Sequence, residues 1–241
     1  MQDISWLSRT EVLLGKDRLK LLCDSHVMIL GLGGVGSFAA EFICRSGVGE
    51  MTIIDGDIVD PSNRNRQLPA LFTTHGLSKT NIMAERLSAI NPEVKINVVN
   101  DFITRERIEC LLDRNPDYAI DAIDSITPKL AFIRQAYDRK LKFVSAMGAG
   151  GRIDPTKLQV ADISETYNCP LAQHLRKKLK KHDIYQGVKV VFSSERPDPA
   201  SLIYTDGSHY KKSAYGTMSY IPATFGAVAA SVVIRDLTGN F

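Results

Sequence analysis

Cysteine is scarce in this sequence. Only four cysteines occur among 241 residues, and the nearest two, Cys23 and Cys44, are 21 positions apart. A local Cys-x-x-Cys pair for zinc or redox chemistry is therefore excluded. The spacing predicts free thiols in a reducing compartment. Cys23, Cys44 and Cys110 fall in helical patterns and are expected in the core.

Long apolar runs are also scarce. Charged residues such as Asp3, Arg9 and Glu11 interrupt the N-terminal stretch. A signal peptide needs a continuous apolar centre, so we expect a cytoplasmic protein. Residues 213–234 carry no charge, and about 20 such residues can span a bilayer. Glycine, proline and hydroxyl residues interrupt this stretch, which favours a loop and a buried helix at 223–237 over stable membrane insertion. Peripheral membrane contact through that helix is the alternative.

Neither charge of one sign nor repetition dominates the chain. Thirty basic and 27 acidic residues give a net charge of +3, too small a surplus to indicate a nucleic-acid binder by itself. The sequence has no repeat, low-complexity tract or obvious linker, and its 44% hydrophobic and 24% charged residues are ordinary for a globular protein. We expect a single domain over residues 1–241.

The chain does have a regular alternation of elements. Short β-rich runs at 26–30, 51–55, 94–100, 118–123 and 141–146 alternate with helical patterns at 34–45, 78–90 and 104–113. This predicts an α/β, Rossmann-like fold with a doubly wound, mostly parallel sheet. After residue 151 a strand pattern at 158–163, a basic helical stretch at 170–181 and a strand pattern at 188–193 follow. This C-terminal strand-helix-strand elaboration predicts a basic substrate-binding insertion around 158–194.

A glycine-rich turn follows the first predicted strand and opens the first long helix. Gly31, Gly33 and Gly36 fit the spacing G-x-G-x-x-G, and Gly34 lies within the same turn. Glycine lets backbone amides approach a phosphate at the positive end of a helix. Asp55 ends the next strand, 22 residues after Gly33, where a carboxylate can bind ribose hydroxyls. The turn therefore predicts a nucleotide site, and its alternative is a glycine turn used only for packing.

Further polar residues favour a triphosphate over a nicotinamide dinucleotide. Two cations and an amide suit a leaving pyrophosphate, and a carboxylate suits its magnesium ion. Taken singly, each has a structural interpretation, as a surface ion-pair partner, a solvated helix residue or a helix cap. The candidates are Asp57, Asn63, Arg66, Gln67, Lys79 and Asp124.

With these motifs the chain resembles the ubiquitin-activating-enzyme superfamily of adenylating (ThiF-type) proteins, which activate a carboxylate with ATP. The resemblance implies that Asn63, Arg66 and Lys79 contact ATP phosphates and that Asp124 supports Mg²⁺ and the adenylate. It also implies a homodimer, in which Arg9 reaches the ATP of the partner.

Within the superfamily, the resemblance is to the family of tRNA threonylcarbamoyladenosine dehydratases. It covers nearly the whole chain. The family cyclises a threonylcarbamoyl group on an adenosine next to the tRNA anticodon, which implies ATP, Mg²⁺ and tRNA as partners; a sulfur-relay protein partner stays open. The resemblance rests on Trp6 and Arg9 and on the segments 45–49, 121–125, 148–155, 170–172, 191–195 and 223–226.

The chemistry implied by the resemblance needs no enzyme thiol. Adenylation turns a carboxylate into a mixed anhydride, and the ureido nucleophile of the same modified base is only a few atoms away, so it can attack within the molecule. Cys169, beside Pro170 in the predicted insertion, is the cysteine placed to provide a nucleophile if one is used.

A basic run in the predicted insertion favours contact with tRNA phosphates, with a solvated helix face as the alternative. The rival enzyme function is adenylation of the C-terminus of a ubiquitin-like sulfur-carrier protein. A non-enzymatic rival is a dinucleotide-sensing module, in which Arg66, Lys79 and Asp124 have no purpose. The basic run comprises Arg176, Lys177, Lys178, Lys180 and Lys181.

Overall fold

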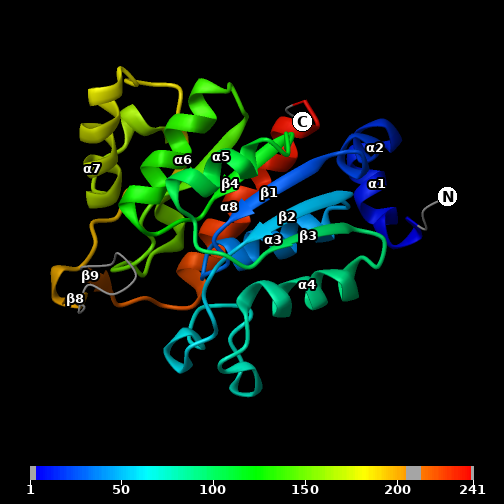
Figure 1. Ribbon diagram of the computed structural model, residues 1–241, viewed down its shortest axis with the longest axis horizontal. Helices are drawn as coiled ribbons and strands as arrows, with labels where there is room; N and C mark the ends of the chain where they lie inside the picture. Colours follow the sequence, from blue (N-terminus) through cyan, green and yellow to red (C-terminus); the bar gives the residue numbers. More distant parts are fainter. Residues whose placement is uncertain (1–3, 205–212, 240–241) are drawn as a thin grey trace.

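A seven-stranded sheet forms the centre of the computed structural model, which describes residues 4–204 and 213–239 (Figure 1). The strand order is β3-β2-β1-β4-β5-β7-β6. Neighbouring strands are parallel except β6 and β7, which are antiparallel. The strands are β1 His26–Leu30, β2 Glu50–Ile54, β3 Lys95–Val99, β4 Tyr118–Asp121, β5 Phe143–Ala146, β6 Leu158–Asp162 and β7 Lys189–Ser193.

The strand order reverses beside β1. The chain runs outward from β1 through β2 to β3 and then returns to β4 on the other side of β1. His26 pairs with Glu50 on one side, and Val27 pairs with Tyr118 on the other. In open parallel sheets, ligands bind in the crevice that such a reversal opens at the carboxyl ends of the strands. The glycine turn after β1 and the loop after β4 border this crevice.

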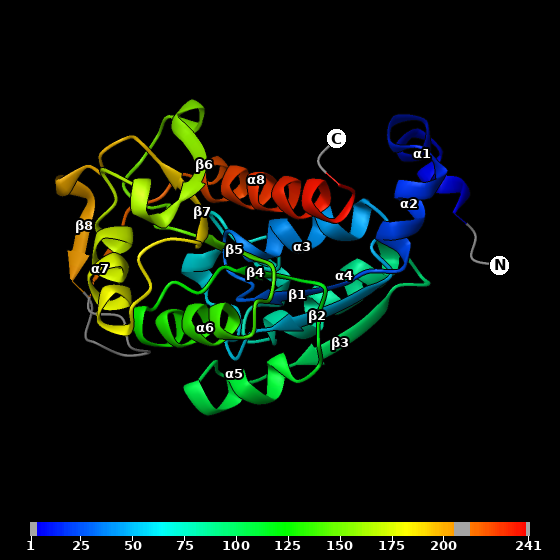
Figure 2. The same cartoon turned by 90° about the horizontal axis from the view of Figure 1, so that it is seen from above.

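Helices cover both faces of the sheet (Figure 2). Strand residues alternate between the faces, so Val27 and Ile29 join one core cluster while Met28 and Leu30 join the other. The first cluster includes apolar residues of three helices, α3 Gly36–Arg45, α4 Lys79–Ile90 and α8 Tyr220–Leu237. The second includes residues of α5 Arg105–Leu112, α6 Ile126–Asp138 and α7 Pro170–Leu179.

Smaller elements lie outside the sheet and its covering helices. Helices α1 Ser8–Leu14 and α2 Lys16–Cys23 lie at the amino ends of the strands, and the hairpin of β8 Leu202–Tyr204 and β9 Ser213–Tyr215 lies near α7 (Figure 1). Short 3₁₀ turns are η1 Ser5–Leu7, η2 Pro61–Asn63, η3 Phe72–Thr74, η4 Pro155–Lys157, η5 Ile163–Glu165, η6 Lys180–His182 and η7 Pro199–Ser201.

The structure confirms the predicted α/β class, the mostly parallel sheet and the β6-α7-β7 elaboration. Helix α8 begins at Tyr220, three residues before the predicted start at Ala223, because Pro222 in a first helical turn needs no amide partner. By length and composition α8 can cross a membrane, yet Phe225, Ala229 and Val233 on it are buried in the core. Of the three cysteines predicted in the core, Cys44 is buried and Cys23 is only half-buried, and the prediction for Cys110 is wrong. Cys110 is exposed, because Ile108, Leu111 and Leu112 form the buried face of α5.

Candidate nucleotide-binding site

The glycine turn is shaped by two positions that exclude any side chain. Gly31 has φ +90°, and a Cβ there would lie 2.9 Å from the carbonyl oxygen of Ala122. A Cβ on Gly36 would lie 1.8 Å from the carbonyl oxygen of Gly31. These glycines let the chain turn sharply and let α3 start against the end of β4.

The space above Gly33 is open. A Cβ placed there would have its nearest neighbour, the Nε2 atom of Gln67, at 3.8 Å. The other amide atom of Gln67, Oε1, is buried and has no hydrogen-bond partner among the described residues. Buried polar atoms are almost always paired in folded proteins, so an orphaned oxygen beside an open glycine turn fits a site completed by a ligand or water. Both observations suit a nucleotide at the amino end of α3.

Asp55 fixes the glycine turn to the end of β2. One carboxylate oxygen accepts a hydrogen bond from Leu32 N (2.6 Å) and the other from Asp57 N (2.8 Å). Burial raises the pKa of Asp55 above its ordinary value, although nearby Lys79 and these two hydrogen bonds act in the opposite direction. Each carboxylate oxygen has a second lone pair that can accept a ribose hydroxyl. Asp55, which was predicted to bind ribose, therefore also stabilises the glycine turn.

Lys79 and Asp57 form a close pair. The ammonium of Lys79 lies 2.9 Å from Asp57 Oδ2, and the lysine side chain is 4% exposed against 42% for the aspartate. Lys79 is the first residue of α4, whose N-cap is Ser78. The lysine therefore enters the crevice from a fixed helix terminus, and its charge is held beside the glycine turn by Asp57.

The Asn63 to Gln67 segment follows the 3₁₀ turn η2. Asn63 is buried, and its Oδ1 accepts from Asp60 N (3.2 Å). Arg66 Nη1 donates to Ser62 O (3.0 Å) and to Asn65 Oδ1 (2.8 Å). Among the described residues, Arg66 makes no ion pair with a carboxylate. Its charge is therefore not neutralised by the protein.

A buried ion pair supports the loop that carries Asp124. Lys129 Nζ lies 2.9 Å from Asp121 Oδ2 and donates to Ile123 O at 2.9 Å, and neither charged side chain is exposed. Asp121 also accepts from Ser145 Oγ (2.6 Å) on β5. These contacts tie together the ends of β4 and β5 and the start of α6. Asp124 follows as an exposed residue at the carboxyl edge of the sheet.

Lys129 was not among the predicted site residues, although the sequence holds a signal for it. It precedes Phe132, Ile133 and Ala136 by three, four and seven positions, which places it on the same helical face as these buried residues. A lysine on a buried face needs a buried partner, and Asp121 is the carboxylate at the end of the neighbouring strand.

One predicted site residue, Arg9, lies away from the crevice, and the candidate nucleophile Cys169 is buried. Arg9 is on α1, and a Cβ on Gly47, in the turn before β2, would lie 2.6 Å from Leu7 Cδ1, so this region packs at the amino ends of the strands. The glycine turn is at the carboxyl end of β1, so one copy of the chain does not bring Arg9 to it (Figure 1). Cys169 is 5% exposed and belongs to the core cluster under α7.

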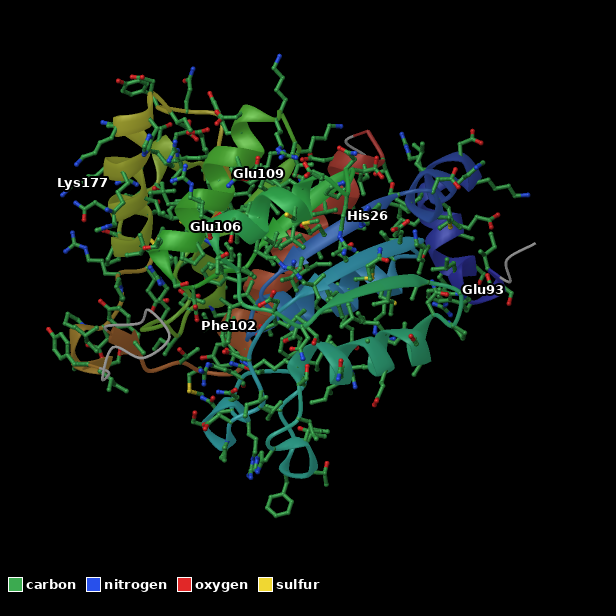
Figure 3. All side chains as sticks on the ribbon, viewed as in Figure 1. His26, Glu93, Phe102, Glu106, Glu109 and Lys177 are labelled. Atoms are coloured by element: carbon green, nitrogen blue, oxygen red, sulfur yellow. The ribbon has the colours of Figure 1, made fainter. Side chains whose placement is uncertain are left out.

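The basic run divides into one anchored residue and four exposed ones. Arg176 is half-buried and donates to Thr166 Oγ1 and to Ile163 O (3.4 Å). The others are at the far end of α7 from the crevice, and Lys177 points outward from that helix (Figure 3). They are Lys177, Lys178, Lys180 and Lys181, all exposed.

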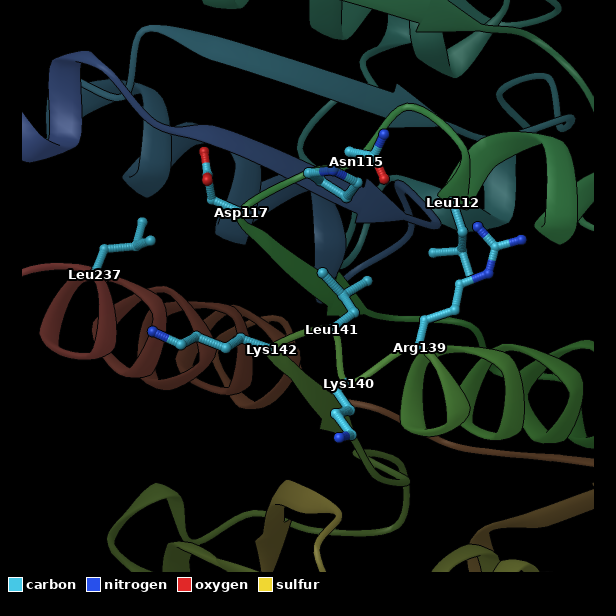
Figure 4. Close-up of a pocket in the computed structure, with 9 residues that line it drawn as sticks. Leu112, Asn115, Asp117, Arg139, Lys140, Leu141, Lys142 and Leu237 are labelled. Atoms are coloured by element: carbon cyan, nitrogen blue, oxygen red, sulfur yellow. The ribbon is translucent and has the colours of Figure 1, made fainter.

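A separate pocket of about 420 Å³ opens at the opposite edge of the sheet (Figure 4). Asn115, Asp117, Lys140 and Lys142 are among its lining residues. These residues directly precede β4 and β5, so the pocket lies at the amino ends of the strands, whereas the glycine turn is at the carboxyl end of β1. This pocket therefore has no part in the nucleotide site.

The carboxylates of the crevice fit magnesium only together with a nucleotide. Among the described residues there is no group of three or more His, Cys, Asp or Glu side chains able to hold a metal ion. Mg²⁺ in ATP sites is usually held by one or two carboxylates, substrate phosphates and water. Asp124 is an exposed carboxylate at this edge and suits that arrangement.

The doubly wound sheet, the glycine turn and the cations around it define a nucleotide-binding protein of the adenylating type. The sequence profile of the ThiF family matches residues 7–240, and the chain belongs to this family. Its relatives over nearly the full length are tRNA threonylcarbamoyladenosine dehydratases. The enzyme of Bacillus subtilis is 40% identical over 237 residues (95% of this chain, 93% of the relative), and that of Escherichia coli is 39% identical over 258 residues (97% and 94%).

Solved structures agree with this placement. The crystal structure of the E. coli dehydratase TcdA has a TM-score of 0.87 and 38% identity, covering 97% of this chain and 94% of TcdA. TcdA has also been solved in complex with ATP, at a TM-score of 0.88 (98% and 96% covered). The E. coli ThiS adenylyltransferase is 32% identical over only 141 residues, 57% of this chain and 55% of that protein. The predicted resemblance to the dehydratases is confirmed.

Proposed function

We propose that this protein uses ATP to cyclise threonylcarbamoyladenosine in the tRNA anticodon loop. The main support for the proposal is the similarity to tRNA threonylcarbamoyladenosine dehydratases, which are 39–40% identical to this chain over nearly its full length. The E. coli dehydratase has been solved with ATP and with AMP. The open glycine turn and the unneutralised charge of Arg66 supply matching local chemistry. Fold alone does not specify a reaction, so the proposal depends on both.

The reaction has two steps. First, the threonyl carboxylate attacks the α-phosphate of ATP, the bond to the β-phosphate oxygen breaks, and pyrophosphate leaves. Then the ureido nitrogen of the same base attacks the activated carbonyl, a ring bond forms, the nitrogen loses its proton, and AMP leaves. The net change in the nucleoside is loss of one water. Because the carboxylate and the ureido nitrogen are on the same base, the reaction needs no nucleophile from the enzyme. The burial of Cys169 agrees with this.

The residues of the crevice are assigned roles by their charges and positions. Arg66 and Lys79 stabilise the negative charge that develops on the phosphates, and Asn63 donates to a phosphate oxygen. The backbone of Gly31, Gly33, Gly34 and Gly36 lets the phosphates approach α3. Asp55 binds the ribose, with Asp57 and Gln67 beside it.

Magnesium is proposed as the metal of the reaction. When bound, it neutralises phosphate charge and orients the pyrophosphate leaving group. Asp124 is the protein carboxylate that would hold it. Lys129 and Asp121 act on this ligand indirectly, because they fix the loop from which Asp124 projects.

The anticodon arm of tRNA is proposed to lie across the carboxyl edge of the sheet and α7. Lys177, Lys178, Lys180 and Lys181 are exposed and unpaired among the described residues, so they can meet the phosphate backbone. Helix α7 has 10 residues, about 15 Å at 1.5 Å per residue, so this contact and the chemistry lie within one tRNA arm.

A homodimer is proposed because Arg9 lies at the wrong edge to serve its own site. In a two-fold assembly the same arginine can approach the ATP of the other copy.

A sulfur-relay protein is a further proposed partner. We also propose a cytoplasmic location, supported by the packing of α8 against α3, with peripheral membrane contact of α8 as the alternative.

One assay separates the proposed function from its rival. The protein is incubated with ATP and Mg²⁺ and with tRNA bearing threonylcarbamoyladenosine, unmodified tRNA, or a carrier protein ending in Gly-Gly. We expect pyrophosphate and AMP only with the modified tRNA, together with a nucleoside lighter by one water. Pyrophosphate release with the carrier alone would instead support sulfur-carrier adenylation.

A further inference from the structure

The side chain of Asn65 lies between Arg66 and the chain segment that precedes α8. Its Oδ1 accepts from Arg66 Nη1 (2.8 Å), and its Nδ2 donates to the backbone oxygen of Thr217 (3.0 Å). Arginine can only donate and a backbone carbonyl can only accept, so these partners fix which end of the amide faces which way. Both ends of Asn65 are therefore in use.

The Thr217 segment belongs to the substrate-side part of the molecule. Gly216 N donates to Ser201 O at the base of the β8–β9 hairpin (2.8 Å), and Gly216 O accepts from Gly151 N (2.8 Å). Hydrogen bonds, together with the peptide bond between Gly216 and Thr217, thus connect Arg66 through Asn65 to the loop after β5. Asn65 is the single side chain that joins the two sides in this path.

Both hydrogen bonds of Arg66 are to neutral oxygens, so its orientation depends on these uncharged partners. Its Nη1 donates to Ser62 O (3.0 Å), and no carboxylate of the described residues holds the guanidinium. A carboxylate partner would orient the arginine but would also cancel the charge needed by a phosphate. A neutral amide orients the guanidinium and leaves its charge available.

We propose that Asn65 is a positioning residue, which sets the orientation of Arg66 toward the ATP phosphates and couples it to the β8–β9 hairpin side of the site. This inference rests on the proposed function, because Arg66 has its role there. Asn65 acts through Arg66 and touches no reacting atom, so its effect must depend on the presence of that arginine.

A double-mutant cycle tests this dependence. The Asn65→Ala, Arg66→Ala and double variants are compared with the wild type in single-turnover AMP formation with modified tRNA, and ATP affinity is measured by calorimetry. We expect Asn65→Ala to lower the rate or the ATP affinity about 10-fold, in line with loss of a hydrogen bond to a charged group. In the Arg66→Ala background, the same change should alter either quantity less than about twofold.

Two further variants complete the design. Asn65→Asp keeps an oxygen toward Arg66, but its negative charge neutralises the arginine and repels Thr217 O. This variant should therefore lose at least as much rate or ATP affinity as Asn65→Ala. Asn81→Ala is the matched control, since Asn81 is exposed on α4 and its side chain makes no hydrogen bond to the residues that the structure describes. It should behave as wild type.

The outcomes are distinct. An equal loss in both arginine backgrounds would show that Asn65 only shapes the loop, and a wild-type rate and affinity in Asn65→Ala would show that it has no role; either overturns the inference. If the wild type itself forms no AMP with modified tRNA, the proposed function fails, and the cycle in ATP affinity still decides whether Asn65 acts through Arg66.

Discussion

Lys129 and Asp121 form an ion pair 2.9 Å long in which neither side chain is exposed. Such a pair gives little net stability against an apolar replacement, but removal of one partner leaves a buried charge without compensation. The pair therefore makes the loop before α6 sensitive to single substitutions while Asp124, a few residues away, is exposed.

Lys129→Met should destabilise the protein by roughly 3 to 5 kcal/mol, because Asp121 is left charged and buried. Chemical denaturation measures the change. Lys129→Met combined with Asp121→Asn should recover part of the loss. Lys95→Met is the control, since Lys95 is 67% exposed in its pair with Glu50 and should cost less than about 1 kcal/mol. A wild-type midpoint for Lys129→Met would contradict the account.

Arg66→Ala and Asp124→Ala should each reduce AMP formation about 10²- to 10³-fold, the typical effect of removing one stabilising group from a reaction site. Neither residue is in the core, so the melting temperature should change little. Near-normal turnover by both variants would remove the adenylation roles. Withdrawal of Mg²⁺ with EDTA should mimic the Asp124 variant in the same assay.

Neutralising the exposed lysines of α7 should weaken tRNA binding without changing ATP binding. Changing Lys177, Lys178, Lys180 and Lys181 to glutamine removes up to four phosphate contacts, and each should lower the slope of log affinity against log salt by roughly 0.7 to 0.9. Filter binding across a salt series measures this slope. If slope and affinity stay at the wild-type values, this end of α7 is a solvated face.

Replacing all four cysteines by serine or alanine should leave cyclisation intact. Cys169 is buried, and burial raises the pKa of the Cys44 thiol to about 12, which disfavours a reactive thiolate there. Some stability should be lost at these two core positions. Mass analysis of the nucleoside is the readout. Complete loss of activity in Cys169→Ser, with ATP still bound, would indicate a thioester mechanism.

Asp236→Asn should destabilise the protein by about 1 kcal/mol at pH 7, as expected for hydrogen bonds to a charged group that is partly exposed. Burial opposes the charge of Asp236, but hydrogen bonds from Lys189 and Tyr118 hold its pKa below the ordinary value of 3.8. The contribution is thus complete above pH 3.8 and is lost as the pH falls through the lower folded-state pKa. Denaturation at pH 7 and pH 3 should show the difference between variant and wild type shrinking.

The sequence predicted most strands because hydrophobic runs bounded by turn residues are a local signal. It did not predict α6. Pro128 near its start and the polar Lys129 on its inner face hide the apolar periodicity, and only the buried partner Asp121 explains that lysine. The β8–β9 hairpin was also missed, because its strands have three residues each and gain their register from contacts such as Gly151 with Gly216.

Parts of the crevice were predictable from the sequence where only one residue type fits the position, as at Gly31 and Gly36. Their close approaches to Ala122 and within the turn require the absence of a side chain. Contacts between distant segments were not predictable. That Asp57 holds Lys79, or that Asn65 bonds to Thr217, follows from tertiary packing over separations no local pattern encodes. The roles of Arg9, Arg66, Lys79 and Asp124 stay predictions.

The position of α8 sets the order in which the chain can fold during its synthesis. This last helix packs against α3, and a Cβ on Gly226 would lie 2.5 Å from Val35 O, directly beside the glycine turn. The nucleotide-binding half is synthesised before this helix, which packs against it. Until α8 is synthesised, the face of β4, β5 and β7 against which it packs lacks this cover, so the nascent chain exposes an apolar surface that can aggregate.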